Sequence, residues 1–369
     1  MNECTQAVTA EVSIADVINS DDINIYRQMA GGVTAAQLLH GSCNPIGGQS
    51  GLIKLRWGSS PEAMKIRDTT GFIKFALGEN VKQSNWGQFN TKRFPQTRMG
   101  VEQVYYDAFI RAKEYQQEWN AYAAVPEKLR ANVTAPRIDL EMETLNEILN
   151  SQRFISCHSY QQGEINMLMH VGDSMGFTVN TFTHILEGYK VADKMKEHGA
   201  GGSTFSDWWA YKFEVNDAIP YNGAIMHEQG VLTAYNSDDA EMGRRLNQEA
   251  AKAVKYGGVS QEEALKFVTL NPAKLLHLDH KMGSIKVGKD ADVVLWSDNP
   301  LSVYAVVQYT IIDGAIYFDL SKDQAMQQKN QAEKARIIAK MVVAKKGGAT
   351  TQPAKLKKPK LYHCDTVGD

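Results

Sequence analysis

Two histidines and one aspartate stand at positions where their side chains can bind a metal ion. His158 closes the run RFISCHS, His184 closes FTVNTFTHI, and Asp238 follows GVLTAYNS. Two imidazoles and a carboxylate suit zinc or another borderline divalent ion, and an open coordination position lowers the pKa of a bound water toward about 7. Asp238 is the expected acceptor of that water's proton. The three residues predict hydrolysis by a metal-activated water.

A structural interpretation competes with this prediction. The chain has nine histidines, and a single histidine at a strand end is more often a hydrogen-bonded structural residue than a ligand. The joint spacing favours the metal, because 26 residues separate His158 from His184 and 54 separate His184 from Asp238. These separations correspond to one and two strand-helix repeats. Of Asp238 and its neighbour Asp239, we expect one to point outward as a helix cap.

The elements that must position these residues alternate between strands and helices, which is typical of α/β proteins. Strands are expected at 33–39, 51–55, 71–77, 153–159, 177–185 and 230–239, and residues 40–50 are expected to form a turn-rich loop. Helices are expected at 22–29, 100–122, 140–150, 162–175, 187–198 and 260–270, the last ended by Asn271-Pro272. Because chemistry gathers at the carboxyl ends of strands in a (β/α)8 TIM-like barrel, we predict that fold.

Composition excludes several classes of protein. Apolar residues make up 43% of the chain and charged residues 22%, without the 18 or more uncharged apolar residues of a membrane helix. Met1 to Cys4 do not resemble a secretory signal, so the chain as given predicts a cytoplasmic protein; a lost signal would make it secreted or periplasmic. Four distant cysteines without a CxxC pair favour a reducing environment or thiols without a particular role.

Charge and texture suggest three parts. Residues 1–282 are expected to be the barrel, 283–320 a small unit of short strands, and 321–369 a basic tail that is helical or disordered. The tail carries a net charge of +7 against −9 for residues 1–320, without an aromatic platform or nucleic-acid motif. We therefore expect no nucleic acid as partner, and composition predicts no transmembrane segment. The metal-activated water predicted above indicates a small-molecule amide or peptide as partner. A homo-oligomer and an anionic surface that holds the tail are left open.

Several segments carry a family resemblance. They are AGGVTAAQLLHGSCNPIGG, FALGEN, HILEGYKVADKM, AYNSDDAEMGRRLNQEAAK, VTLNPAKLLHL and GSIKVGKDADVVLWSDNPL. From about Asp21 to Asp319 the chain resembles the amidohydrolase superfamily of metal-dependent hydrolases, in the branch similar to imidazolonepropionases and dipeptidases. The last segment resembles the return of these enzymes from barrel to β-sandwich.

The resemblance implies roles for named residues. His158 and His184 would be the metal ligands of the fifth and sixth barrel strands, and Asp238 the ligand and proton shuttle of the eighth. A bridging ligand is implied as well, either Lys74 as a carbamylated lysine or Glu79. A structural ion pair of Lys74 is the alternative. One or two zinc ions would be the cofactor.

One departure from the family pattern is large. Superfamily members usually open the barrel with an HxH pair on the first strand, and the chain contains no HxH. We therefore expect a barrel that is incomplete at its first strand. The alternative to a hydrolase of amide, peptide or cyclic amide bonds is a truncated or non-catalytic relative that binds a ligand or partner without turnover.

An aromatic loop after His198 is the predicted wall of the substrate site. Asp207, Trp208, Trp209 and Tyr211 combine indole rings with a carboxylate, which suits an amphipathic or zwitterionic ligand. Packing in the core is the alternative role for these residues. Arg244 is expected either to recognise a substrate carboxylate or to pair with Glu241.

Overall fold

The computed structural model describes residues 2–82, 93–206, 212–350 and 352. Its strands are β1 (Ala35–Leu38), β2 (Ile46–Gln49), β3 (Gly51–Lys54), β4 (Gly71–Ala76), β5 (Arg153–His158), β6 (Thr181–His184), β7 (Gly201–Thr204), β8 (Thr233–Tyr235), β9 (Val293–Trp296), β10 (Val307–Ile312) and β11 (Ala315–Asp319).

Its α-helices are α1 (Ile23–Ala30), α2 (Pro61–Met64), α3 (Arg98–Ala124), α4 (Glu127–Arg130), α5 (Leu140–Leu149), α6 (Gln162–Met175), α7 (Ala192–His198), α8 (Asn222–Glu228), α9 (Leu246–Gly257), α10 (Gln261–Lys266), α11 (Leu270–Leu275) and α12 (Leu320–Lys346). Short 3₁₀ turns are η1 (Ile14–Val17), η2 (Glu79–Val81), η5 (Gly188–Lys190), η6 (Phe213–Val215) and η7 (Gly243–Arg245).

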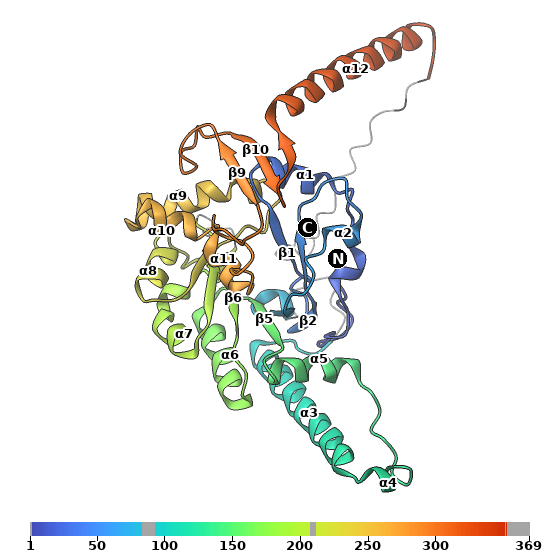
Figure 1. Cartoon of the computed structure of the whole chain (residues 1–369), viewed down its shortest axis with the longest axis vertical. Helices are drawn as coiled ribbons and strands as arrows, with labels where there is room; N and C mark the ends of the chain where they lie inside the picture. Colours follow the sequence, from blue (N-terminus) through green and yellow to red (C-terminus); the bar gives the residue numbers. More distant parts are fainter. Residues whose placement is uncertain (1, 83–92, 207–211, 351, 353–369) are drawn as a thin grey trace.

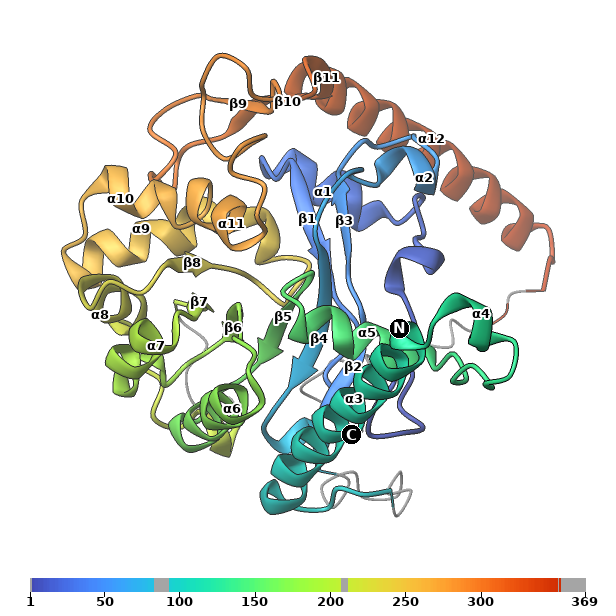
Figure 2. The ribbon, with the colours of Figure 1, turned by 60° about the horizontal axis from the view of Figure 1, so that its bottom comes forward.

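The main sheet has six strands in the order β2-β4-β5-β6-β7-β8. Strands β4 to β8 are parallel, and β2 runs antiparallel to β4. Helices α6, α7 and α8 lie outside the curve of these strands (Figure 2). The predicted α/β class with a parallel sheet is confirmed, while the described residues form an open sheet and not a complete eight-stranded barrel. The carboxyl ends of β4 to β8, with the loops that follow them, are called the rim below.

Helix α3 shows how the apolar pattern builds the outer layer. Thr97 caps its start by accepting a hydrogen bond from the N–H of Gly100. Its apolar residues recur at intervals of three and four and are all buried, namely Val101, Val104, Tyr105, Ala108, Phe109 and Ala112. The ring of Tyr105 stacks on Phe75 of β4 with a centroid distance of 5.4 Å. The helix continues two residues beyond each predicted end and forms, with α4, a projection at one end of the molecule (Figure 1).

Two strands depart from the sequence prediction. β1 pairs with β3 in a separate antiparallel ribbon, and β2 lies in the segment predicted to be a loop. The glycines that suggested a loop serve close packing instead, because a Cβ on Gly47 would lie 2.9 Å from Nδ1 of His40 and 3.2 Å from the carbonyl oxygen of Lys74. The turn-forming composition of residues 40–50 therefore led to the wrong prediction of a loop where the edge strand β2 lies.

The expected helix from Ser260 onward is divided earlier than predicted. Ser260 caps α10 by accepting from the N–H of Glu263, but α10 ends at Lys266 and α11 begins at Leu270. Pro272 lies in the first turn of α11, where a missing N–H costs no intrahelical hydrogen bond. Asn271-Pro272 thus starts a helix and does not end one.

A second hydrophobic core joins an early segment of the chain to the small C-terminal sheet. Strands β9 to β11 form a three-stranded sheet, and Val307, Ile312 and Phe318 from it pack with Met29 of α1 and Ile53 of β3. Thr310 of β10 also donates a hydrogen bond to the carbonyl oxygen of Met29 at 2.8 Å. The small β unit predicted for 283–320 is therefore packed on residues from the first sixth of the chain, while the predicted domain boundaries stay a prediction.

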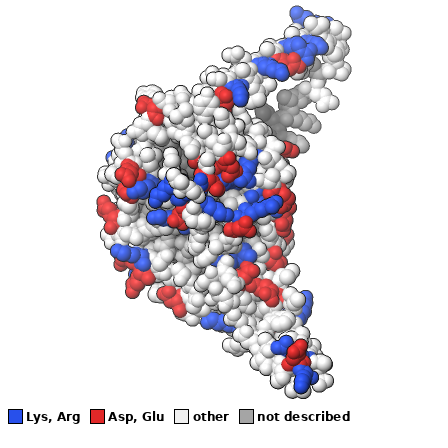
Figure 3. All heavy atoms as spheres, viewed as in Figure 1, with Lys and Arg blue, Asp and Glu red and all other residues white. Residues whose placement is uncertain are grey.

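The tail begins as a long exposed helix. α12 projects from the molecule (Figure 1), buries none of its residues, and carries basic and acidic side chains along its length (Figure 3). No helix in the described part of the chain is long and apolar enough to cross a membrane.

The cysteine prediction is wrong for one pair. Cys4 and Cys43 form a disulfide with a Cα–Cα distance of 5.7 Å. The pair forms because the N-terminal segment runs along β2, where Val8 bridges to Ile46. Cys157 is a free thiol buried in the core.

Candidate active site

The two predicted histidine ligands meet at the rim. β5 ends at His158 and β6 ends at His184, as the sequence predicted. Parallel pairing of β5 with β6 brings these strand ends together, and the two imidazole rings lie edge to face with centroids 4.8 Å apart. Both side chains are buried. His184 has a φ of 70°, a left-handed backbone that a non-glycine residue seldom adopts, and such positions cluster at functional sites.

Asp238 lies beside the second of these histidines. It follows β8 by three residues, and its Oδ2 lies 3.8 Å from Nε2 of His184. Its side chain is 35% exposed, so a solvent water and a substrate can both reach it. The neighbouring Asp239 accepts hydrogen bonds from the N–H groups of Glu241 and Met242, so it caps a turn and not the start of a helix as predicted.

Asn236 sets the orientation of His184, and sequence reasoning missed it. Its side-chain amide lies 3.3 Å from Nδ1 of His184, and with the amide oxygen turned toward the ring it accepts the Nδ1 hydrogen. The lone pair of His184 is then on Nε2, the nitrogen nearest Asp238. Its place two residues before Asp238, in the same strand-end segment, is the signal that could have identified it.

Two aromatic rings form the wall behind the histidines. Tyr160 lies edge-on to His158 at a centroid distance of 4.6 Å, and Phe205 stacks on His184 at 4.7 Å. Both are buried. Such packing fixes the imidazole rings and keeps bulk water from their far side.

The two candidates for a bridging ligand lie in different surroundings. Lys74 is buried in β4 opposite Ser156, two residues before the register pair of Ala76 with His158, so it lies one step below the rim. Glu79 stands on the rim in η2, but its Oε1 is 2.8 Å from Arg98 and its Oε2 is 3.0 Å from Lys82. Burial opposes ionisation of Glu79, yet Lys82 and Arg98 outweigh burial and lower its pKa.

The predicted substrate residues divide into two groups. Asp207, Trp208, Trp209 and Tyr211 lie outside the described residues. Arg244 is described, and its guanidinium lies 2.6 Å from Glu241, which also pairs with Arg27 of α1. In this structure Arg244 takes the ion-pair arrangement that the sequence left as an alternative.

The residue types at the rim suit a divalent metal ion, but the distances between them are not those of a formed metal site. Two buried imidazoles and a nearby carboxylate are the ligands that zinc prefers. Within residues 2–82, 93–206, 212–350 and 352, however, no group of three or more His, Cys, Asp or Glu side chains is arranged to hold a metal ion. The residue types thus suit a metal ion, and in this structure His158 contacts His184, which in turn lies near Asp238.

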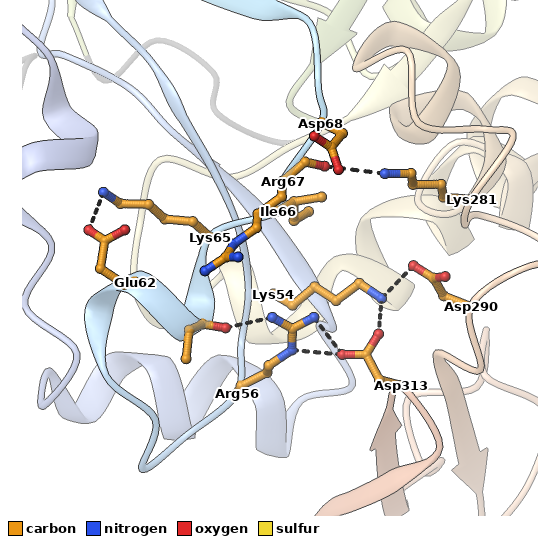
Figure 4. Close-up of a pocket in the computed structure, with 11 residues that line it drawn as sticks. Lys54, Arg56, Glu62, Lys65, Ile66, Arg67, Asp68, Lys281, Asp290 and Asp313 are labelled. Carbon is orange, nitrogen blue, oxygen red and sulfur yellow. Dashed lines mark hydrogen bonds and ion pairs between the residues drawn. The ribbon is translucent and has the colours of Figure 1, made fainter.

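A second ionic group lies away from the rim and was not predicted. Nζ of Lys54 in β3 lies 2.7 Å from Asp290 and contacts Asp313 (Figure 4). It also lies 3.0 Å from Asp292; Asp290 and Asp292 precede β9, and Asp313 follows β10. Arg56 reaches the other oxygen of Asp313 at 2.6 Å. These five residues are called the Lys54 cluster, and all of them except Asp292 line a cavity of about 460 Å³. No predicted site residue that the structure describes lines this cavity.

Comparison with known proteins identifies the family of this chain. A sequence profile of the amidohydrolase family matches residues 219–322. The crystal structure of an amidohydrolase from Thermotoga maritima is 31% identical, has a TM-score of 0.77, and aligns over 86% of this chain and 80% of that one. The chain belongs to the amidohydrolase family, as its motifs indicated.

Two curated relatives add detail. Amidohydrolase tasK of Hapsidospora irregularis is 31% identical over 350 residues, which is 89% of this chain and 35% of that protein. The imidazolonepropionase of Thermoplasma volcanium is 28% identical over 168 residues, 43% of this chain and 41% of that enzyme. The chain thus aligns with well under half the length of either relative.

Proposed function

We propose that this chain is a metal-dependent hydrolase that cleaves a C–N bond of an amide, a peptide or a cyclic amide. The observation that carries the proposal is the approach of His158, His184 and Asp238 at the carboxyl ends of parallel strands, in a chain of the amidohydrolase family. The names of its relatives, amidohydrolase and imidazolonepropionase, support amide-type substrates.

The residues have distinct roles in this proposal. His158 and His184 would hold a zinc-like ion, and Asn236 would keep Nε2 of His184 available to it. Lys74 is the favoured bridging residue for a second ion, because both oxygens of Glu79 face cations. A bound divalent ion supplies a water of lowered pKa and polarises the substrate carbonyl.

Asp238 moves the proton. Its carboxylate takes a proton from the attacking water as the new C–O bond forms, and gives that proton to the departing nitrogen as the C–N bond breaks. The half-exposed position of Asp238 beside a buried imidazole suits this exchange. The amphipathic loop residues Asp207, Trp208, Trp209 and Tyr211 would contact a small amide or peptide.

Release of amine from a panel of dipeptides, N-acyl amino acids and cyclic amides tests the proposal, with zinc content measured on the same samples. We expect His184→Ala and Asp238→Asn to lower turnover about a thousandfold. His170→Ala is the matched control, because His170 lies exposed on α6. Unchanged turnover in the first two variants would refute the assignment.

The alternative is a relative that binds a ligand or partner without turnover, as the absence of HxH from the sequence suggested. A folded wild-type chain that releases no amine from the whole panel in the presence of zinc would favour that alternative over the hydrolase.

A further inference from the structure

Six charged side chains join the loops of the rim. Arg98, the first residue of α3, places Nη2 2.8 Å from Oε1 of Glu79 and Nε 2.6 Å from Oε1 of Glu164. The same Nη2 lies 3.9 Å from Oε2 of Glu214. Lys82 pairs with Glu79 at 3.0 Å, and Lys212 with Glu214 at 2.8 Å. These residues are called the Arg98 cluster.

The three carboxylates come from three separate rim segments. Glu79 lies in η2 after β4, Glu164 in the first turn of α6 after β5, and Glu214 in η6 after β7. Parallel strands place all three segments on one side of the sheet. One guanidinium therefore links loops that no short stretch of sequence connects.

Two of these carboxylates are deeply buried. The side chain of Glu164 is 7% exposed and that of Glu214 is 1% exposed. Glu214 also accepts the backbone N–H of Glu79 at 2.9 Å. A Cβ on Gly78 would lie 2.9 Å from Oε2 of Glu214, so the positive φ of Gly78 and its lack of a side chain both serve this contact. A buried carboxylate is stable only when paired and hydrogen-bonded, which ties the loop positions to the cation.

The cluster reaches the histidine pair through one aromatic ring. Nζ of Lys212 lies 4.4 Å from the centroid of the Tyr160 ring, and that ring lies 4.6 Å from His158. A shift of Glu214 would move Lys212, and Lys212 covers the ring that packs on the imidazole.

We propose that Arg98 is a positioning residue of the active site, which holds Glu79, Glu164 and Glu214 together and thereby fixes Tyr160 and the His158 ring. The inference rests on the proposed function for its kinetic consequence. It assigns Glu79 to the cluster and not to a metal.

Kinetics of four variants test the proposal on the amide that the wild-type chain hydrolyses fastest. Arg98→Met removes the cation, and Arg98→Met/Glu164→Gln also removes a buried charge that would otherwise lose its partner. Arg98→Lys is the conservative variant. Arg111→Met is the matched control, because Arg111 lies on the same helix with a half-exposed side chain and pairs with Asp107 and Glu141.

We expect the double variant to fold with a near wild-type unfolding midpoint and to lose about a hundredfold in kcat with KM almost unchanged. Arg98→Lys should recover most of kcat, and Arg111→Met should match the wild type. A folded double variant with wild-type kcat would overturn the proposal, because burial of charge alone would then explain the cluster.

Hydrogen exchange separates this outcome from failure of the proposed function. The N–H of Glu79 donates to Glu214, so its exchange rate reports the cluster directly. We expect about tenfold faster exchange in the double variant than in Arg111→Met. If the wild-type chain hydrolyses no amide, the proposed function fails, and unchanged exchange at Glu79 would independently overturn the role of Arg98.

Discussion

The Lys54 cluster buries its cation, whereas the Arg98 cluster leaves its shared cation partly exposed. In the first, the ammonium is 2% exposed and its partner Asp292 is 6% exposed, while Asp290 and Asp313 are 38% and 37% exposed. In the second, the cation is 37% exposed and two carboxylates are almost fully buried. One cluster surrounds a buried cation with acids, and the other gathers buried acids around one shared cation.

This difference decides which cluster titrates near neutral pH. Burial favours the neutral amine of Lys54, but hydrogen bonds to Asp290, Asp313 and Asp292 outweigh burial and raise its pKa. Burial raises the pKa of Glu164 to about 7; the charge of Arg98 only partly opposes this, and the nearby carboxylate of Glu214 adds to it. Lys54 therefore stays charged near neutral pH, whereas the charge of the Arg98 cluster changes with pH through Glu164.

The largest effect on stability is expected from Lys54→Met. The change leaves three close carboxylates without their buried cation and should lower the free energy of unfolding by about 4 kcal/mol, measured by urea denaturation at pH 7. Because Lys54 lies away from the rim, kcat of the folded variant should be unchanged. A loss of kcat at full folding would remove the distinction between the clusters.

A smaller effect is expected from Glu164→Gln, and it depends on pH. The carboxyl has a pKa of about 4.5 when unfolded and about 7 when folded, so protonation stabilises the fold below pH 4.5 and this contribution is lost as pH rises through 7. Since glutamine does not titrate, the stability of the variant relative to wild type should increase by about 2.5 kcal/mol from pH 5 to pH 8. Parallel stability curves over this range would contradict the sensitivity assigned to the Arg98 cluster.

Asp290→Asn should have a modest effect. Asp290 is one of three acids around Lys54, and its side chain is 38% exposed, so solvent screens much of its interaction. We expect a loss of about 1 kcal/mol in urea denaturation. A loss as large as that of Lys54→Met would show that the three acids do not share the buried charge.

The smallest effect is expected from Glu333→Gln on α12. Its bidentate contact with Arg336 is fully exposed on a helix that buries no residue. The unfolding midpoint should not move measurably, in contrast to changes in either cluster. A clear shift in thermal denaturation would mean that α12 packs against something in solution.

Local patterns predicted those parts of the fold that local forces determine. The bounds of α6 agree with the predicted range 162–175, and the two strand-ending histidines follow from the strands that contain them. Asp238 was predicted from its place in the expected strand 230–239, and it lies three residues beyond the observed strand β8 (Thr233–Tyr235).

Contacts between distant segments could not be predicted in this way. Asn236 contacts His184 across 52 residues, and Arg98 gathers Glu79, Glu164 and Glu214 from three loops. The Cys4–Cys43 disulfide forms because the N-terminal segment runs along β2. The glycine-rich composition of this strand had predicted a loop. Each of these contacts depends on the tertiary structure and cannot be predicted from the spacing of residues along the chain.

The second core has a consequence for the order in which the protein matures on the ribosome. Met29 and Ile53 are synthesised early, but their partners Val307, Ile312 and Phe318 emerge some 250 residues later. At about 5 to 20 residues per second this leaves the early apolar surface uncovered for roughly 10 to 50 s. Nascent chains of this protein should therefore bind chaperones through α1 and β3 until translation passes Phe318.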